Sequence, residues 1–498
     1  MKKKIAYVFK CLIFLAILVP ALMLFTKILE QKYLYDDRWP STTTTKKFYD
    51  LEPDSVDVLF MGSSRSASTF IPQELYNNYG IRSYNLGTQA QSVVVTYYWL
   101  KEALRTQTPK AVVMESYMLF EYRPDNALNS EEPKIRAALD NMQWGGVKQE
   151  AIHQISLLDE EQDEISYYLP YIRYHSRWTD LGEDDFDYIQ MEQNMGLMGY
   201  SLLDGKAKTE YEPLNAEKAE DPEEKEEFHP LMIDYFSRIV QLCKEQNIQL
   251  ILVTIPYEDP ELGRYNTLKE YTDRNEIDYY DFNTPELYTE LGMEYGEDME
   301  DSKHCNYQGA RKLTNWAGKC LTEKYGIEGV EDPQWEQGQK AYKDALYGAS
   351  LQYITDYDQY IDALKNYPDY TVFIGYKGDR NDYYTKEIQS KLKKLGLKSD
   401  LTQNSAACYY AIIDQEEIQE NFSVNSVSAS GSFRDGRSLY SVTSASEEKG
   451  NTCSIIIDGE DESPNKTGLN IVVYDNFLKR VVDSVCFAPK KDGMTAKR

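Results

Sequence analysis

The sequence predicts an α/β protein in three parts: a single N-terminal transmembrane helix, a parallel-sheet domain with an insertion, and a smaller α+β domain. Three observations lead to this prediction. A long apolar run opens the chain, short apolar runs then alternate with helix-period segments, and β-rich segments fill the C-terminal part. The 498 residues leave room for such a division at about 150 residues per domain.

The composition excludes several classes of protein. Hydrophobic residues make up 42% and charged residues 27%, which are globular values that argue against wholesale disorder and against a multi-span transporter. A net charge of −28 repels phosphate backbones, so nucleic acid is not an expected partner. The 42 tyrosines suit a surface that touches polyols, or half-wet positions in strands.

Residues 1–32 are predicted to form a cytoplasmic tip and a membrane anchor. Three lysines precede an apolar run from Ile5 to Leu29, which makes about 37 Å of helix and reaches across a bilayer. A cleavable signal peptide is the alternative, but no small-x-small cleavage motif follows the run. The basic flank places the N-terminus in the cytoplasm and the bulk of the chain, from about residue 33, on the outer face of the cell membrane.

The seven cysteines have no metal-binding spacing, and no metal or cofactor is expected. Cys11 lies in the predicted anchor. Outside the cell the remaining six could pair, Cys453 with Cys486 for example, but their sparse spacing fits a chain that does not depend on disulfides.

Residues 33–328 are predicted to form the parallel-sheet domain. Helix-period segments such as 93–104 and 231–246 separate short apolar runs, and buried strands linked by helices indicate a parallel sheet. The predicted strands are 56–61, 81–86, 111–115, 248–256 and 277–282. Residues of about 125–230 break this rhythm and are predicted to be an insertion that ends in the charged loop 217–227.

The C-terminal part divides into a linker at 329–350, a domain at 351–490 and a tail at 491–498. The linker is assigned because Pro333 and several charges follow the last sheet segment. The predicted domain elements are helices at 357–366 and 385–395, the second closed by Gly396, and strands at 370–375, 407–414, 424–428, 440–444, 452–457, 468–474 and 480–487.

A serine follows the first predicted strand directly. Gly62-Ser63-Ser64-Arg65 places Ser64 past the carboxyl end of that strand, where α/β sheets present ligand-facing groups. The N–H groups of a following helix can stabilise an oxyanion. The alternative is that Gly-Ser-Ser is only a turn that caps the helix.

The second candidate motif is Asp301-Ser-Lys-His304, after the last predicted strand and before a predicted helix at 310–321. A serine nucleophile needs a neutral imidazole to accept its proton and a carboxylate to orient that imidazole. His304 is the favoured base because the other three histidines fall in or beside the insertion. A surface Asp-His turn is the alternative.

These two motifs, in this order, resemble those of the SGNH (GDSL-type) hydrolase superfamily over about 55–325. The resemblance implies a flavodoxin-like sheet, Ser64 as nucleophile, His304 as base, Asp301 as its orienting carboxylate, and an oxyanion held by the N–H groups of Ser64 and Gly87. Gly87 belongs to Tyr84-Asn85-Leu-Gly87, which looks like the second family block. The family's Gly-x-Asn block is missing, and Glu115 stands near its place.

A membrane-anchored chain with Gly-Ser-Ser and without the Gly-x-Asn block resembles a divergent branch of this superfamily, that of the DltD-type teichoic-acid D-alanylation proteins and the alginate O-acetylation proteins. This resemblance implies an O-acyltransferase on a cell-surface polysaccharide or teichoic-acid-like polymer, with a membrane-bound O-acyltransferase (MBOAT) as a possible partner. Arg65, Asn85 and Glu115 are the candidate substrate-binding residues; for Arg65 a surface salt bridge is the alternative. Two further alternatives are a carbohydrate O-esterase and a non-catalytic, glycan-binding assembly factor.

The C-terminal domain resembles the interleukin-like EMT inducer (ILEI) domain over about 355–490. The resemblance lies in the segments 370–379 and 468–475, in the reverse of the family's order, as in a circular permutation. It implies a β-sandwich-like module that binds glycan, with Tyr376, Tyr383 and Tyr384 as exposed stacking residues. A purely structural cap is the alternative.

Overall fold

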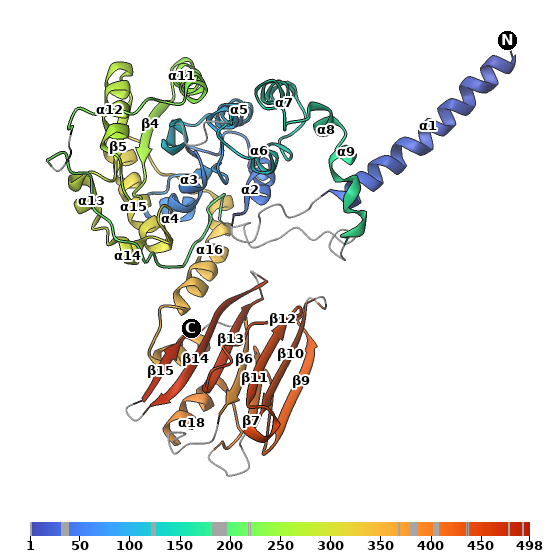
Figure 1. The fold of residues 1–498 in the computed structure, drawn as a ribbon, viewed down its shortest axis with the longest axis vertical. Coiled ribbons are helices and arrows are strands. Elements are labelled where there is room, and N and C mark those ends of the chain that lie inside the picture. Colours follow the sequence, from blue (N-terminus) through green and yellow to red (C-terminus); the bar gives the residue numbers. More distant parts are fainter. Residues whose placement is uncertain are drawn as a thin grey trace. The chain divides into compact units, whose positions relative to one another are not determined.

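The chain folds into two compact units, residues 1–339 and 340–498. The structure, a computed structural model, describes residues 2–30, 39–120, 126–181, 197–217, 219, 221–366, 369–378, 386–401, 408–434, 436, 438–476, 479–490 and 493–498. Each unit has its own β-sheet core (Figure 1).

The first unit is built on a parallel five-stranded sheet, as the sequence predicts. Its strands are β1 (Val58–Met61), β2 (Ser83–Asn85), β3 (Ala111–Glu115), β4 (Gln249–Thr254) and β5 (Asp278–Asp281). Their order is β2-β1-β3-β4-β5, and all four pairings are parallel. This is the strand order of flavodoxin-like sheets, in which ligands bind beyond the carboxyl ends of the strands where the order reverses. Here the reversal lies between β1 and β3.

Helices cover both faces of this sheet (Figure 1). Leu59, Met61 and Val112 point to the face that α5, α7 and α11 cover, and they join one large apolar core. α3, α4 and α15 pack together on the opposite side. The helices of this part are α2 (Ser41–Lys47), α3 (Ser64–Thr69), α4 (Pro72–Tyr79), α5 (Val93–Ala103), α11 (Pro230–Glu245), α12 (Leu262–Asn275), α13 (Pro285–Leu291), α14 (Tyr295–Asp298) and α15 (Tyr307–Glu323), with the short 3-10 helices η1 (Phe48–Asp50) and η2 (Tyr117–Leu119).

The predicted insertion contains several short helices, all of them in its first half where the structure describes it. It contains α6 (Glu132–Leu139), α7 (Gly146–Leu158), α8 (Glu164–Tyr168), α9 (Tyr171–Tyr174) and η3 (His175–Thr179). Its charged end, 217–227, has neither helix nor strand at its described positions.

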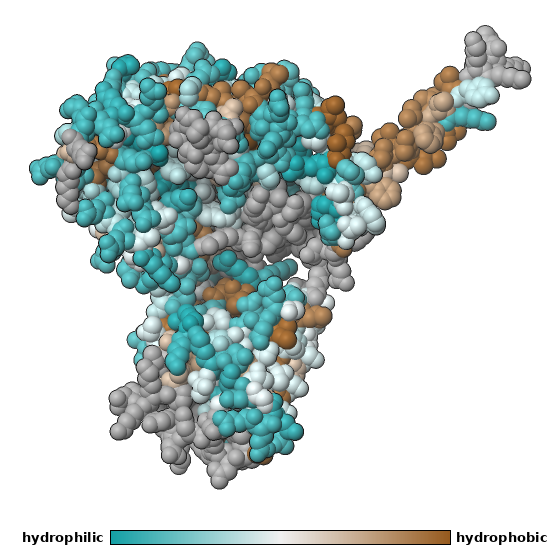
Figure 2. All heavy atoms as spheres, in the orientation of Figure 1, coloured by the Kyte–Doolittle hydropathy of each residue, from teal (hydrophilic) through white to brown (hydrophobic). Residues whose placement is uncertain are grey.

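The N-terminal helix α1 (Lys2–Leu29) is long and apolar over its greater part (Figure 2). Its segment Tyr7–Leu29, of 23 residues, is long and apolar enough to cross a membrane.

The predicted linker at 329–350 is helical over most of its length, because α16 (Pro333–Leu351) is a helix of 19 residues. The boundary between the two units falls within it. Pro333 suggested a break, but proline is favoured in the first turn of a helix, where its missing N–H costs nothing. Trp335 follows in that turn; it is fully buried, and its Nε1 donates to the Ser83 carbonyl at 3.3 Å.

The second unit consists of two antiparallel sheets and a few helices, as an α+β, sandwich-like domain requires. One sheet has the order β15-β14-β13-β6-β7-β8 and the other β12-β11-β10-β9, and a shared apolar core contains Phe373 of β6, Val442 of β10 and Ile455 of β11. The elements are α17 (Tyr357–Lys365), β6 (Tyr370–Lys377), α18 (Lys386–Leu392), η5 (Lys393–Leu395), β7 (Cys408–Asp414), β8 (Glu417–Ser423), β9 (Ser426–Ser432), β10 (Leu439–Ala445), η6 (Glu447–Lys449), β11 (Thr452–Ile457), β12 (Glu460–Asp461), β13 (Gly468–Asp475), β14 (Arg480–Lys490) and β15 (Gly493–Lys497).

Three details of this unit differ from the sequence predictions. The strand predicted at 424–428 begins in the turn between β8 and β9. The predicted tail contains β15, which pairs with β14. Cys453 and Cys486 are both buried free thiols, so the pairing considered for them is not made.

Replacing Trp335 with alanine should destabilise the first unit by about 3–5 kcal/mol, the usual cost of truncating a buried aromatic side chain. Urea unfolding of the detergent-solubilised full chain, followed by far-UV circular dichroism, measures the change. Trp178→Ala is the matched control, because Trp178 is 70% exposed and its loss should cost less than about 0.5 kcal/mol. Equal stability of the two variants would contradict the buried position of Trp335.

Candidate active site

Ser64 begins helix α3 at the carboxyl end of β1. The strand ends at Met61, and Gly62 turns the chain with a φ of +137°, a conformation that side chains with a Cβ rarely adopt. A Cβ on Gly62 would also lie 2.8 Å from the Cβ of Glu115. Ser63 caps α3 by accepting a hydrogen bond from the Arg65 N–H at 3.3 Å. The tight turn therefore fixes Ser64 at the rim of the sheet.

His304 lies beside Ser64 although 240 positions separate them in sequence. The distance between Ser64 Oγ and His304 Nε2 is 3.0 Å, a hydrogen bond. On the other side of the ring, His304 Nδ1 lies 2.9 Å from Asp301 Oδ2. Asp301 also accepts the N–H groups of Lys303 and His304, which closes the turn that carries the imidazole. The structure thus brings the three predicted catalytic residues together in the geometry of a serine, base and carboxylate.

The charges of this triad are set by burial and by its own hydrogen bonds. Burial lowers the pKa of His304 below its usual value of 6.5 and outweighs the opposing effect of Asp301, so the ring is neutral near pH 7. Burial alone would raise the pKa of Asp301, but hydrogen bonds from His304 and the turn amides lower it to about 2. The ionised carboxylate therefore accepts the Nδ1–H, and Nε2 is left to accept the Ser64 proton.

Trp39 covers the imidazole and was not found by sequence reasoning. Its ring centroid lies 4.8 Å from that of His304, with the two rings tilted by 52°. This contact helps to keep water from the base, while Ser64 and His304 each stay 8% exposed and thus within reach of a substrate. Nothing in the local sequence around Trp39 relates it to a histidine 265 positions away.

Arg65 is buried, which corrects the expectation of a surface salt bridge. Its side chain is 1% exposed, and its guanidinium lies between the rings of Tyr117 and Tyr257, at 4.1 and 4.6 Å from their centroids. Its Nε donates to the Lys303 carbonyl at 3.1 Å, directly before His304. Arg65 therefore connects the helix of Ser64 to the loop of His304 and acts as a positioning residue.

Glu115, at the end of β3, is also buried and is unsuited to bind substrate directly. Its carboxylate accepts hydrogen bonds from the Ser63 hydroxyl at 2.8 Å and the Tyr117 N–H at 2.6 Å. One of its oxygens lies 4.0 Å from Arg65 Nη1. Burial raises its pKa, although the Arg65 charge and these hydrogen bonds oppose the shift. Glu115 supports the turn of Ser63, and its carboxylate supplies no N–H donor to the site.

Two further predicted residues have structural roles in this structure. Asn85 is fully buried, and its side-chain amide donates to the carbonyls of Ser66 and Phe70 at 2.8 and 3.1 Å. The Gly87 N–H donates to Asn85 Oδ1 at 3.0 Å, so it is engaged within its own turn and is not a free oxyanion donor. Of the two expected donors, the N–H of Ser64 remains.

The predicted glycan-stacking residues are not supported as a group. Tyr376 lies in β6 and is only 4% exposed, because both faces of its sheet are covered, so it cannot stack on a sugar from solvent. Tyr383 and Tyr384 lie outside the described residues.

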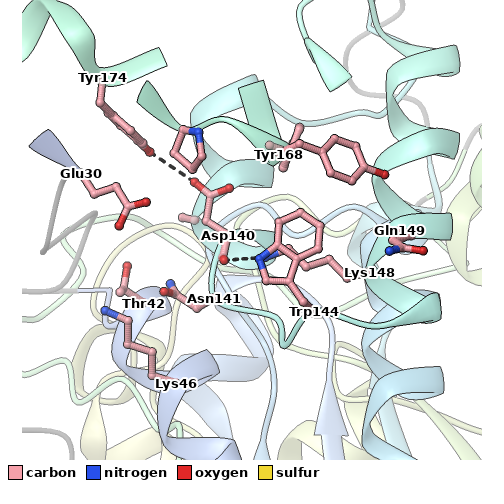
Figure 3. A pocket seen from close by; sticks show the side chains of 13 residues that line it. Glu30, Thr42, Lys46, Asp140, Asn141, Trp144, Lys148, Gln149, Tyr168 and Tyr174 are labelled. Atoms are coloured by element: carbon pink, nitrogen blue, oxygen red, sulfur yellow. Dashed lines mark hydrogen bonds between the residues drawn. The ribbon is translucent and has the colours of Figure 1, made fainter. Parts of the chain in front are cut away.

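Other features of the described residues lie apart from this triad. No cluster of three His, Cys, Asp or Glu side chains that could hold a metal ion occurs among them. A cavity of about 450 Å³ lies between Glu30, Lys46, Asp140, Lys148 and Tyr174 and does not include Ser64 (Figure 3).

In comparisons with known proteins, no protein-family model matches the chain, and no curated protein matches it either.

Because His304 is buried, its pKa should lie below 6.5, and removing Trp39 or Asp301 should shift it in opposite directions. Trp39→Ala exposes the ring and should raise this pKa, whereas Trp39→Phe keeps an aromatic cover and should change it less. Asp301→Asn removes a charge that favours the imidazolium and should lower it. Nuclear magnetic resonance titration of histidine-labelled protein measures these values, and a pKa above 6.5 in the parent would contradict the burial argument.

Proposed function

We propose that this chain is a membrane-anchored, extracytoplasmic serine acyltransferase of SGNH type that acts on a cell-surface polysaccharide or teichoic-acid-like polymer. One observation carries the proposal: Ser64, His304 and Asp301, from distant segments, form a continuous hydrogen-bonded chain at the sheet edge where flavodoxin-like folds bind ligands. A buried, neutral base beside a serine hydroxyl is the arrangement that nucleophilic catalysis needs.

In the first step, Ser64 Oγ attacks the carbonyl carbon of an acyl donor while His304 Nε2 accepts the hydroxyl proton. The tetrahedral intermediate collapses, the bond to the leaving group breaks, and the leaving group takes the proton from His304. In the second step, an acceptor hydroxyl gives its proton to His304 and attacks the acyl-serine. Ser64 Oγ then leaves, regains the proton, and the acyl group stays on the acceptor. Asp301 holds the imidazole in the required tautomer through both steps.

The oxyanion environment has few free donors, which we expect to slow both transfer and hydrolysis in the absence of the natural substrates. The Gly87 N–H is already engaged, and Glu115 replaces a side-chain amide donor, so Ser64 contributes the one expected backbone donor. Loss of a single oxyanion donor costs about 10²–10³ in rate in serine hydrolases. We therefore expect slow turnover of simple soluble esters and faster reaction when the bound acceptor completes the site. Hydrolysis to a free acid, as in a carbohydrate O-esterase, is the second candidate function.

The remaining parts of the chain fit a task at the cell surface. Lysines 2–4 lie in α1 before its apolar segment Tyr7–Leu29, which favours a cytoplasmic N-terminus and an outward-facing fold. An MBOAT-type partner would deliver the acyl group across the membrane to Ser64. The β-sandwich-like second unit would bind the glycan, in the manner of the ILEI domain that it resembles.

Replacing Ser64 with alanine should abolish formation of an acyl-enzyme and reduce acyl transfer by about 10⁴-fold or more, because no other group supplies the nucleophile. Incubation of the full chain with an activated acyl ester, followed by mass spectrometry of the peptide that contains Ser64, measures the adduct.

Ser68→Ala is the matched control for this variant, since Ser68 lies on the same short helix and its hydroxyl faces the Arg65 carbonyl at 3.4 Å. This variant should keep full activity. Unchanged polymer acylation in cells that carry Ser64→Ala would contradict catalysis and favour the non-catalytic assembly factor.

The helix α1 should hold the chain in the membrane with residues 39 onward outside. After alkaline carbonate washing, the full chain should remain with the membranes, and protease added to intact cells or spheroplasts should remove the folded units. Replacing Leu15 and Ile17 in α1 with aspartate should release the chain, because each charge at the bilayer centre costs about 3 kcal/mol. A chain that stays soluble without these substitutions would contradict the anchor.

A further inference from the structure

One surface of the first unit carries an unusual number of exposed apolar side chains. We name it the α8–η3 face; it comprises residues 164–179, the helices α8, α9 and η3 and the turn between them. Six of its large side chains are between 41% and 70% exposed: Ile165, Tyr168, Leu169, Tyr171, Ile172 and Trp178. Single exposed apolar residues are normal, but a contiguous group on one face marks an interaction surface.

The α8–η3 face begins where the apolar helix α1 ends. α1 packs against α9 and η3, and Arg177 Nη1 donates to the carbonyl of Leu29 at 2.6 Å. Leu29 itself is buried in this contact. Figure 2 shows apolar side chains gathered over α8 and α9 beside the base of α1. The exposed face is therefore continuous with the surface of the predicted membrane span.

The composition of the face matches the boundary between lipid and water. It mixes Trp and Tyr, which prefer the headgroup level, with Leu and Ile, which prefer the acyl chains. Its charges are two arginines and one glutamate, in a chain whose net charge is −28. Anionic headgroups are thus repelled less here than by the rest of the surface.

The cavity of about 450 Å³ lies beside the α8–η3 face, and Tyr168 and Tyr174 of that face line it. Figure 3 shows it between Glu30, which directly follows α1, and Trp144, Lys148 and Tyr168. Its lining is polar and aromatic, as a site in the headgroup layer requires. Lys148 is held there by the carbonyls of Asp140 and Met142, at 2.7 and 2.9 Å.

We infer that the α8–η3 face rests on the outer surface of the lipid bilayer, with its aromatic and aliphatic side chains inserted at the headgroup boundary. The inference rests on the proposed anchoring by α1 and adds a second, peripheral contact with the membrane. Together with the span of α1, this second contact would fix the orientation of the first unit relative to the bilayer.

Fluorescence quenching by brominated lipids tests this contact, because Trp178 is the most exposed large side chain of the α8–η3 face. The full chain is reconstituted in phosphatidylcholine–phosphatidylglycerol vesicles whose acyl chains are either plain or brominated. Brominated chains should quench part of the tryptophan fluorescence, and Trp178→Phe should remove most of that quenchable part. Trp316→Phe is the matched control: Trp316 packs between Tyr280 and Phe282, away from the face, and its replacement should leave quenching unchanged.

A second variant separates the face from the anchor. Leu169→Asp together with Ile172→Asp should strongly reduce quenching of Trp178, while flotation with the vesicles and the circular dichroism spectrum stay the same. If the parent floats with the vesicles but Trp178 is not quenched, the face serves a protein partner or a second copy, and the inference is wrong. If the parent does not float at all, the proposed anchor is wrong and the inference falls with it.

Discussion

A buried guanidinium, that of Arg65, joins the segments that form the candidate site. It follows Ser64 in sequence, donates to the carbonyl of Lys303 beside His304, and lies between the rings of Tyr117 and Tyr257. Its two terminal nitrogens have no hydrogen-bond partner among the described residues, so ring faces and the Glu115 charge at 4.0 Å compensate its burial. Through Arg65, the position of the His304 imidazole depends on the segments that follow β1, β3 and β4.

This arrangement gives Glu115 a structural role at the rim of the sheet. Glu115 stands where a side-chain amide is expected, but it supports the turn of Ser63 and balances Arg65 instead of touching substrate. Removing the carboxylate would leave a buried cation without compensation, which is strongly destabilising. Glu115 and Arg65 therefore act as a buried pair that holds together the loops of Ser64 and His304.

Much of the fold could be predicted because its signals are local. Each buried parallel strand is a short apolar run, and the run at 111–115 coincides with β3 residue for residue. The grouping of Ser64, His304 and Asp301 could also be predicted. The chain has only four histidines, and one of them, His304, stands three positions after Asp301, near the end of the sheet domain.

The remaining features depend on contacts that no local pattern records. Trp39 meets His304 across 265 positions, and nothing distinguishes Tyr117 and Tyr257 from the other 40 tyrosines before the chain is folded. Arginine is seldom fully buried, so composition favours the surface for Arg65. Tyr376 was expected to be exposed, but its strand is covered on both faces, and the sequence of such a strand does not alternate between buried and exposed positions. Pro333 suggested a break in structure, but proline is found at the start of helices as well as where they are interrupted.

If α1 spans a bilayer as proposed, the contact between Trp39 and His304 also limits how far Ser64 can lie from the lipid. Nine residues separate Leu29 from Trp39, and a fully extended chain covers at most about 36 Å over the ten Cα–Cα steps between them. With α1 in the bilayer, Trp39 and the imidazole beneath it work within that radius. If the chain transfers acyl groups to a surface polymer as proposed, acceptors in the outer layers of a thick wall would lie beyond this tether, and modification would take place close to the membrane.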